Sequence, residues 1–152
     1  MKKRKKAVKN NKVIPKTAST IENITENELE MLGLKKKDMS ISIVLRYYDY
    51  TYQCFSDWKS NELKLFSKFV DKLRKLTWSQ VHSQSSNKNK TGLALTYINR
   101  NQLPQKDILK EISPEIRIFE LRISDKVRVH GFRIKNSFFL IWLDRNHEIC
   151  PT

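Results

Sequence analysis

Residues 116–149 carry the pattern that most constrains the fold of this chain. They read IRIFELRISDKVRVHGFRIKNSFFLIWLDRNHEI, in which two short polar segments, at residues 124–126 and 135–137, interrupt strand-like runs. Runs rich in β-branched and aromatic residues between such turns predict consecutive antiparallel strands. The last run, at residues 138–143, is apolar on both faces, as expected of a strand in the middle of a sheet. The sequence therefore predicts a meander of three strands.

The segment before the meander predicts one more strand and an amphipathic helix. Residues 42–50 are rich in β-branched and aromatic side chains, which favours a strand. After Ser56, a good helix N-cap, apolar residues recur at helical spacing and lysines occupy the opposite face. Thr77 and Gln80 predict the capping box of a second, short helix, followed by a loop at residues 82–90. We expect an α+β fold, a small antiparallel-rich sheet with helices packed on one face and the other face open.

The first forty residues have a different character. Residues 1–19 are basic and polar with no periodic apolar face, which predicts a mobile extension. Thr25 and Glu28 match a capping box, so a short helix is expected at about residues 26–32. We therefore expect a basic N-terminal extension over residues 1–40 and a folded domain over residues 41–152.

The charge of the chain points to an anionic partner. Its 152 residues include 30 Lys+Arg against 16 Asp+Glu, a formal net charge of +14. Such an excess favours nucleic acid, an anionic membrane surface or an acidic protein. The sequence has no Gly-rich phosphate loop, no CxxC pair and no apolar run long enough to span a bilayer. We expect a cytoplasmic protein without a membrane partner.

Arginines and histidines gather in the meander. They are Arg122, Arg128, His130, Arg133, Arg145 and His147. The planar guanidinium binds phosphate in bidentate fashion and stabilises charge that develops on an attacked phosphodiester, and histidine can protonate the leaving oxygen. The alternative is that the arginines lie on a solvated strand face and pair with Glu120 or Asp144. Because a solvated face usually mixes lysine, glutamate, threonine and serine, we favour a functional surface.

The segment RISDKVRVHGFRIKNSFFLIWLDRNHEI, residues 122–149, is similar to the C-terminal half of toxins of the RelE/ParE superfamily, particularly the YoeB and HigB types. The shared features are an R-I-S-D turn, Arg128 opening the next strand, an apolar strand and a histidine-containing end. The order of elements agrees over residues 41–149. This resemblance implies a RelE-like fold and cleavage of mRNA, often on the ribosome, by the substrate's own 2′-hydroxyl without a metal or other cofactor.

The same resemblance implies roles for individual residues. Arg128 would stabilise the phosphate and His147 would be the general acid. We predict Glu120 as the general base, with Asp107, Glu111 and Glu115 as alternatives. The further residues predicted to contact RNA are Arg122, His130, Arg133 and Arg145. The implied partners are mRNA, the ribosome and an acidic antitoxin protein.

Two other functions fit the same basic face. One is a non-catalytic module that binds nucleic acid or protein, such as an inhibitor from a phage or mobile element. The other is inhibition of a topoisomerase, as in ParE-like members, which share the fold but do not cut RNA. A nuclease should lose cleavage on replacement of Arg128 or His147, whereas a binding module should lose affinity gradually as basic residues are neutralised.

Overall fold

The computed structural model describes residues 25–31, 40–86 and 92–150, and the chain divides into two compact units, Met1–Asp38 and Met39–Thr152. In the first unit it describes one helix, α1 (Glu26–Met31). The predicted capping box is confirmed, because the Thr25 N–H donates to Glu28 Oε2 (2.8 Å) and the Glu28 N–H to Thr25 Oγ1 (3.3 Å). The mobile extension predicted at residues 1–19 lies outside the described residues.

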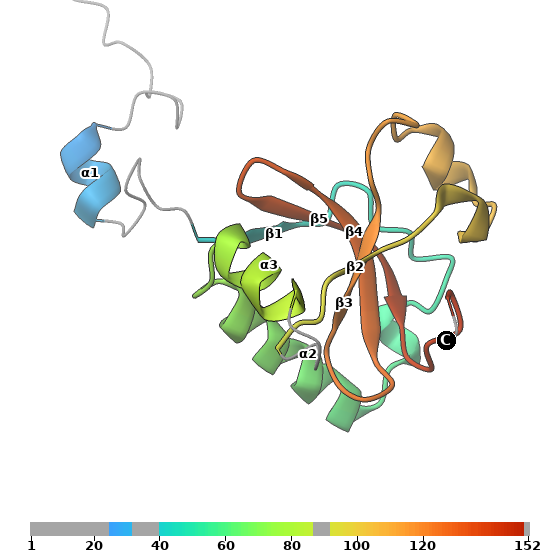
Figure 1. Ribbon diagram of the computed structural model, residues 1–152. Helices are drawn as coiled ribbons and strands as arrows, with labels where there is room; N and C mark the ends of the chain where they lie inside the picture. Colours follow the sequence, from blue (N-terminus) through green and yellow to red (C-terminus); the bar gives the residue numbers. More distant parts are fainter. Residues whose placement is uncertain (1–24, 32–39, 87–91, 151–152) are drawn as a thin grey trace, which may run out of the picture. The chain divides into compact units, whose positions relative to one another are not determined.

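The second unit is built on a five-stranded sheet of order β1-β5-β4-β3-β2 (Figure 1). The strands are β1 (Ser42–Val44), β2 (Thr96–Tyr97), β3 (Phe119–Arg122), β4 (Arg128–Ile134) and β5 (Ser137–Asp144). β1 runs parallel to β5, and the other three pairs are antiparallel. The predicted α+β class and the three-strand meander are confirmed, and the apolar β5 occupies the interior position that its sequence indicated.

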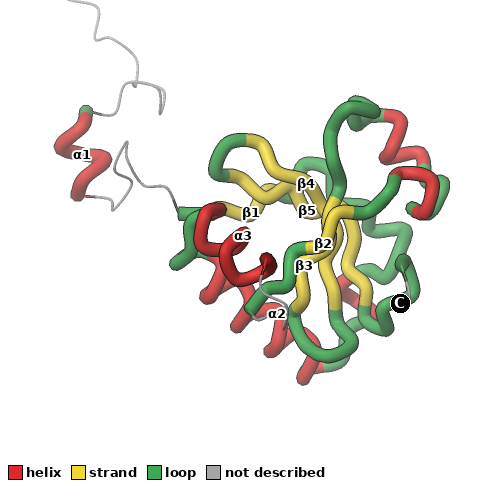
Figure 2. The backbone as a smooth tube through the Cα atoms, in the orientation of Figure 1, coloured by secondary structure: helices red, strands yellow, loops and turns green. Residues whose placement is uncertain are grey.

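Two α-helices of the described residues pack on one face of this sheet, α2 (Ser60–Leu73) and α3 (Trp78–Ser86) (Figures 1 and 2). The long helix begins later than predicted, since Ser56 belongs to a separate 3-10 turn, η2 (Phe55–Asp57). The Glu62 carboxylate instead accepts the Lys59 N–H (2.7 Å) and holds the start of α2. The capping box of α3 is confirmed, with the Thr77 N–H donating to Gln80 Oε1 (2.8 Å), but α3 continues through His82, where a loop was predicted.

The other face of the sheet is covered, so the prediction of an open face is wrong. A second hydrophobic cluster lies there, built from the end of the chain, from β4 and β5, and from the 3-10 helices η3 (Arg100–Gln102) and η4 (Asp107–Lys110) with their flanks. Its buried members are Leu103, Leu109, Ile112, Ile118, Phe132, Ile141, Trp142 and Ile149. The first strand, β1, is shorter than predicted: it ends at Val44 and not at Tyr50, so the residues after it are free to form a loop over the second face. The following loop packs Tyr47 on Phe132 and Tyr52 on Trp142, with ring centroids 5.5 and 6.5 Å apart.

A bulge in β5 decides which side chains reach this second face. Opposite β4, Gly131 pairs with Leu140 whereas His130 pairs with Trp142, so Ile141 is an extra residue in β5. The Asp49 N–H donates to the Ile141 carbonyl (2.9 Å), and Trp142 Nε1 donates to Asp49 Oδ2 (3.0 Å). A bulge reverses the alternation of side chains beyond it. Trp142 and Asp144 therefore share a face with their partners His130 and Arg128.

Candidate catalytic cluster on the second sheet face

Four side chains meet on the second face around one carboxylate, and we call them the Glu120 cluster: Glu120, Arg128, His130 and His147. Glu120 lies on β3 directly opposite His130 on β4. One carboxylate oxygen, Glu120 Oε2, lies 3.4 Å from Nε2 of both histidines. The other, Oε1, lies 3.8 Å from Nε of Arg128. The three residues predicted as base, acid and phosphate ligand are therefore neighbours, joined by a second histidine.

The cluster is largely buried. The side chains of Glu120, Arg128 and His147 are 11%, 12% and 15% exposed, and His130 is fully buried. Glu120 Oε2, His147 Nε2 and both ring nitrogens of His130 have no protein hydrogen bond. Buried polar atoms are nearly always hydrogen-bonded in proteins, and contacts of 3.4 Å between them are mainly electrostatic. The cluster therefore holds several buried polar atoms that no protein group hydrogen-bonds, which is uncommon in a folded protein.

The electrostatic surroundings keep Glu120 in its charged form. Burial raises the pKa of Glu120, but His130, His147 and Arg128 together lower it by more, so the net pKa lies below its ordinary value. Burial also lowers the pKa of Arg128, which the nearby Glu120 carboxylate partly offsets. A lowered pKa keeps the Glu120 carboxylate ionised, and so free of a proton, at neutral pH, and it also makes the carboxylate a weaker base.

The turn that carries His147 is held by Asp144 at the end of β5. The fully buried Asp144 carboxylate accepts the backbone N–H groups of Glu148 (2.8 Å) and Ile149 (3.0 Å). His147 itself has a left-handed backbone with φ of 59°, which is uncommon for a residue other than glycine. Such strain is typical of functional sites. Sequence reasoning did not assign Asp144 to the site, and its only signal was the abrupt change of polarity after residue 143.

The residues predicted to contact RNA are dispersed. Arg122 lies next to the cluster, as the cross-strand partner of Arg128. Arg133 and Arg145 point to the helix side, where Arg133 lies over Trp78 (5.3 Å to the ring centroid) and Arg145 Nε donates to Glu62 Oε2 (2.9 Å). The prediction that His130 contacts RNA is wrong, because a fully buried imidazole cannot touch RNA directly.

The alternative bases lie apart from Arg128 and His147. Asp107, Glu111 and Glu115 are exposed, and Asp107 pairs with Lys110 (2.6 Å). Glu120 is thus the one of the four predicted carboxylates that joins the cluster.

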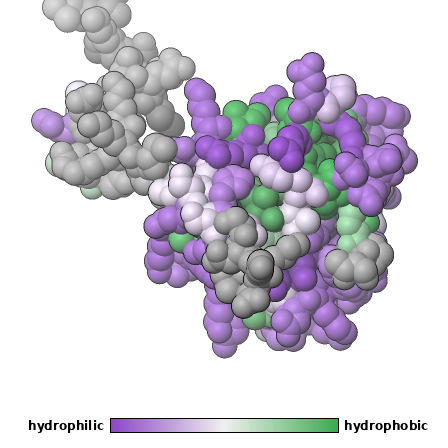
Figure 3. Space-filling view, viewed as in Figure 1, coloured by the Kyte–Doolittle hydropathy of each residue, from purple (hydrophilic) through white to green (hydrophobic). Residues whose placement is uncertain are grey.

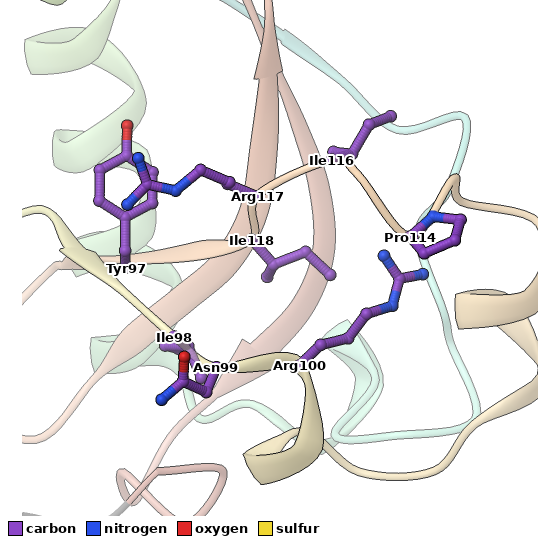
Figure 4. Close-up of a pocket in the computed structure, with 8 residues that line it drawn as sticks. All are labelled: Tyr97, Ile98, Asn99, Arg100, Pro114, Ile116, Arg117 and Ile118. Carbon is purple, nitrogen blue, oxygen red and sulfur yellow. The ribbon is translucent and has the colours of Figure 1, made fainter.

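Two hollows in the surface are lined by residues other than those of the Glu120 cluster. The first has a volume of about 230 Å³ and is lined by residues 97–100, Pro114 and residues 116–118 (Figure 4). The second, about 530 Å³, is lined by Arg100, Lys106, Lys110 and their neighbours. Neither includes Arg128 or His147. The surface seen in Figure 3 is mostly hydrophilic, with smaller hydrophobic patches.

Comparisons of this chain with protein-family models, with curated proteins and with solved structures give no match. Among the helices that the structure describes, none has the length and apolar character needed to cross a membrane.

Proposed function

We propose that this protein is an endoribonuclease that cleaves mRNA by attack of the 2′-hydroxyl on the adjacent phosphate. One observation carries the proposal: the Glu120 carboxylate lies 3.4 Å from His147 Nε2 and 3.8 Å from Arg128 Nε. A base, an acid and a fixed guanidinium are the groups that this reaction needs, and no metal is required to supply them.

In the proposed reaction Glu120 accepts the proton of the 2′-hydroxyl as its oxygen attacks phosphorus. A bond forms between the 2′-oxygen and phosphorus, and the bond from phosphorus to the 5′-oxygen breaks. Protonated His147 gives its proton to that leaving oxygen. Arg128 faces the charge that builds on the non-bridging oxygens. The products are a 2′,3′-cyclic phosphate and a 5′-hydroxyl.

His130 has a positioning role in this proposal. Its Nε2 lies 3.4 Å from the same Glu120 oxygen that faces His147. Because His130 is fully buried between β3 and β5, it limits where the carboxylate can move. Its contribution lowers the pKa of Glu120, which favours the ionised base.

The setting of the reaction is also proposed. A RelE-like fold and action on the ribosome follow from the resemblance over residues 122–149, whereas the basic N-terminal extension and the cytoplasmic location follow from the composition of the chain. A net charge of +14 supports binding to mRNA and ribosome and inhibition by an acidic antitoxin.

A non-catalytic binding module is the second candidate, and the burial of the cluster favours it. A Glu120 side chain that is 11% exposed and ion-paired with Arg128 is also what a structural salt bridge looks like. In a toxin the RNA must displace or share the contacts of Arg128. In a binding module the cluster would only stabilise the sheet, and an inhibitor of phage or mobile-element origin or a ParE-like topoisomerase inhibitor would use the exposed basic residues.

The deciding experiment is cleavage of end-labelled RNA, free and ribosome-bound, by the purified full chain with a chelator present. We expect cyclic phosphate ends, and no cut where the attacking nucleotide lacks its 2′-hydroxyl. His147→Ala and Glu120→Gln should each reduce the rate by about a hundredfold to ten-thousandfold. Arg128→Ala should reduce it by about a hundredfold or more.

His82→Ala is the matched control, since His82 lies on α3 over the opposite face of the sheet. It should cleave at the wild-type rate. Circular dichroism spectra and urea unfolding must show that each slow variant is folded. Absence of cleavage by the wild type in both forms of the assay, or full activity of folded His147→Ala, would reject the nuclease in favour of the binding module.

A further inference from the structure

The pocket in Figure 4 lies where two neighbouring chain segments separate. The Ile98 N–H donates to the Ile118 carbonyl (3.0 Å), and beyond this bond the chain diverges into η3 on one side and the approach to β3 on the other. Side chains of Tyr97, Asn99, Arg100, Ile116, Arg117 and Ile118 line the resulting hollow of about 230 Å³. It is a concave site with an apolar base and polar walls, as expected for a small aromatic ligand.

One wall is a preformed stack. The Arg117 guanidinium lies 3.6 Å from the centroid of the Tyr97 ring, and both side chains are exposed (Figure 4). The ring in turn packs on buried Phe119, 5.7 Å away between centroids, which anchors it to the sheet. Arginine planes and aromatic rings are the surfaces on which proteins stack unpaired RNA bases. The free side of the Arg117 plane can extend this stack by one base.

The opposite wall is held rigid by Arg100. Its guanidinium donates to the carbonyl oxygens of Leu109 (2.7 Å), Ile112 (2.6 Å) and Ser113 (2.8 Å). These bonds fix the end of η4 beside the pocket and keep positive charge there. Asn99 is exposed at the rim, with an amide that can donate to and accept from the edge of a base.

The pocket lies at the β2 edge of the sheet: its Tyr97 pairs with Phe119 on the helix side, whereas its Ile118 belongs to the second face, which also carries Glu120. Ile118 lies two residues before Glu120 along the chain that enters β3, so their Cα atoms are roughly 7 Å apart. On the neighbouring strand Thr96, next to Tyr97, pairs with Glu120. Arg100 also lines the second hollow, whose Lys106 has its Nζ 5.6 Å from the centroid of the Tyr52 ring. Basic groups thus continue from the pocket toward the loop that packs on Trp142.

We propose that this pocket binds one nucleobase of single-stranded RNA, stacked on Arg117 and read by Asn99. The base belongs to a nucleotide near the scissile phosphate, so the inference rests on RNA being the substrate of the Glu120 cluster. Such a subsite sets the sequence preference of cleavage, while the cluster itself contacts only backbone atoms.

Binding of the full chain to a short 2′-O-methyl oligoribonucleotide tests the proposal separately from cleavage, because this RNA lacks the attacking hydroxyl. A set of oligonucleotides, each with one abasic position, is compared by fluorescence anisotropy. We expect one position at which loss of the base weakens wild-type binding by about tenfold. Arg117→Lys keeps the charge but not the plane, so it should bind all members of the set equally.

Arg46→Lys is the matched control, since Arg46 is also exposed and lies 6.0 Å from the centroid of a tyrosine ring, that of Tyr47. It should retain the position-dependent loss. The inference is overturned if the wild type does not bind the RNA, if its affinity is the same across the abasic set, or if Arg117→Lys keeps the wild-type pattern. A position-dependent loss without any cleavage of natural RNA would retain the pocket and reject the nuclease.

Discussion

Glu120 is the residue on which the charged groups of the second face depend. Its carboxylate is buried and has two imidazoles and one guanidinium within 3.8 Å. Burial alone would make this carboxylate harder to ionise, and the neighbouring positive groups reverse the effect. The same contacts that would suit a general base therefore also contribute to the stability of the fold, and the two contributions can be measured separately.

The first prediction concerns the acid stability of the fold. Because the pKa of Glu120 is lowered in the folded state, the folded chain binds fewer protons than the unfolded chain near and below the ordinary value of 4.5. The stabilisation is present above that value and is lost as pH falls through the lowered pKa. Between about pH 5 and about pH 3, the free energy of unfolding measured in urea should therefore fall less for Glu120→Gln than for the wild type. Glu111→Gln is the control for removing an exposed glutamate, and parallel pH curves for wild type and Glu120→Gln would contradict the prediction.

The second prediction concerns the backbone of His147. A left-handed conformation costs most side chains roughly 1–2 kcal/mol, and asparagine tolerates it because its short amide can hydrogen-bond locally. His147→Asn should therefore keep the free energy of unfolding or raise it by up to about 1 kcal/mol, while RNA cleavage is lost. His82→Asn, in the helical backbone of α3, should bring no such gain. A greater loss of stability in His147→Asn than in His82→Asn would show that the strain is not relieved.

At the level of elements, the pairing of β4 with the bulged β5 determines what the second face carries. Without the extra residue at Ile141, Asp144 would point toward the helices and could not hold the turn of His147. At the bulge the Ile141 carbonyl accepts a hydrogen bond from the Asp49 N–H, and this bond fixes the loop after β1. Next to the bulge, β4 has Gly131 where its neighbours carry side chains.

The third prediction tests how closely these two strands must approach. A Cβ on Gly131 would overlap the Phe139 carbonyl oxygen and lie 2.7 Å from Phe138 Cε2, so backbone would have to move. Gly131→Ala should lower the free energy of unfolding by about 3 kcal/mol or more. Ile134→Ala, at the exposed end of the same strand, should cost about 1 kcal/mol or less. Equal stability of the two variants in urea would refute the close approach.

At the scale of the whole molecule, the charge of +14 should dominate binding to any nucleic acid. The fourth prediction follows from the release of counterions when phosphates are neutralised. If about six phosphates are contacted, the affinity for uncleavable single-stranded RNA should fall by about three hundredfold between roughly 50 and 200 mM salt. Cleavage at saturating RNA should change little, because the reacting groups are buried. Fluorescence anisotropy measures the first effect and single-turnover cleavage the second, and an affinity independent of salt would argue against a polyanionic partner.

Much of the fold could be predicted from local sequence. The three-strand meander could be predicted from two polar turns, at residues 124–126 and 135–137, and from the apolar run of β5 that follows the second turn. The Thr25–Glu28 and Thr77–Gln80 pairs located two helix starts, because a capping box involves only residues one turn apart. The prediction that Ser56 begins the long helix was wrong, because several residues in this stretch can cap a helix. Glu62, which holds the actual start of α2, also contacts Arg145, a residue far away in the sequence that gives no local signal.

The candidate site was only partly accessible to the same reasoning. Alternation along a strand placed Arg128, His130 and Glu120 on predictable faces, and His147 came from the resemblance. Neither could tell that His130 is buried, that Arg133 and Arg145 turn to the helix side, or that Tyr97 and Arg117 stack beside a pocket. Their roles in RNA cleavage and binding stay predictions.

By itself the sequence determined the class of the fold, the meander and the excess of positive charge, since these depend on composition and on contacts between near neighbours. Only the tertiary structure decided that the second face is covered, that a bulge brings Asp144 beside Arg128, and that two histidines share one carboxylate oxygen. The physical reason is packing. Where a strong local preference, such as that of Tyr47 for a strand, competes with burial of a whole sheet face, the burial of apolar area outweighs it.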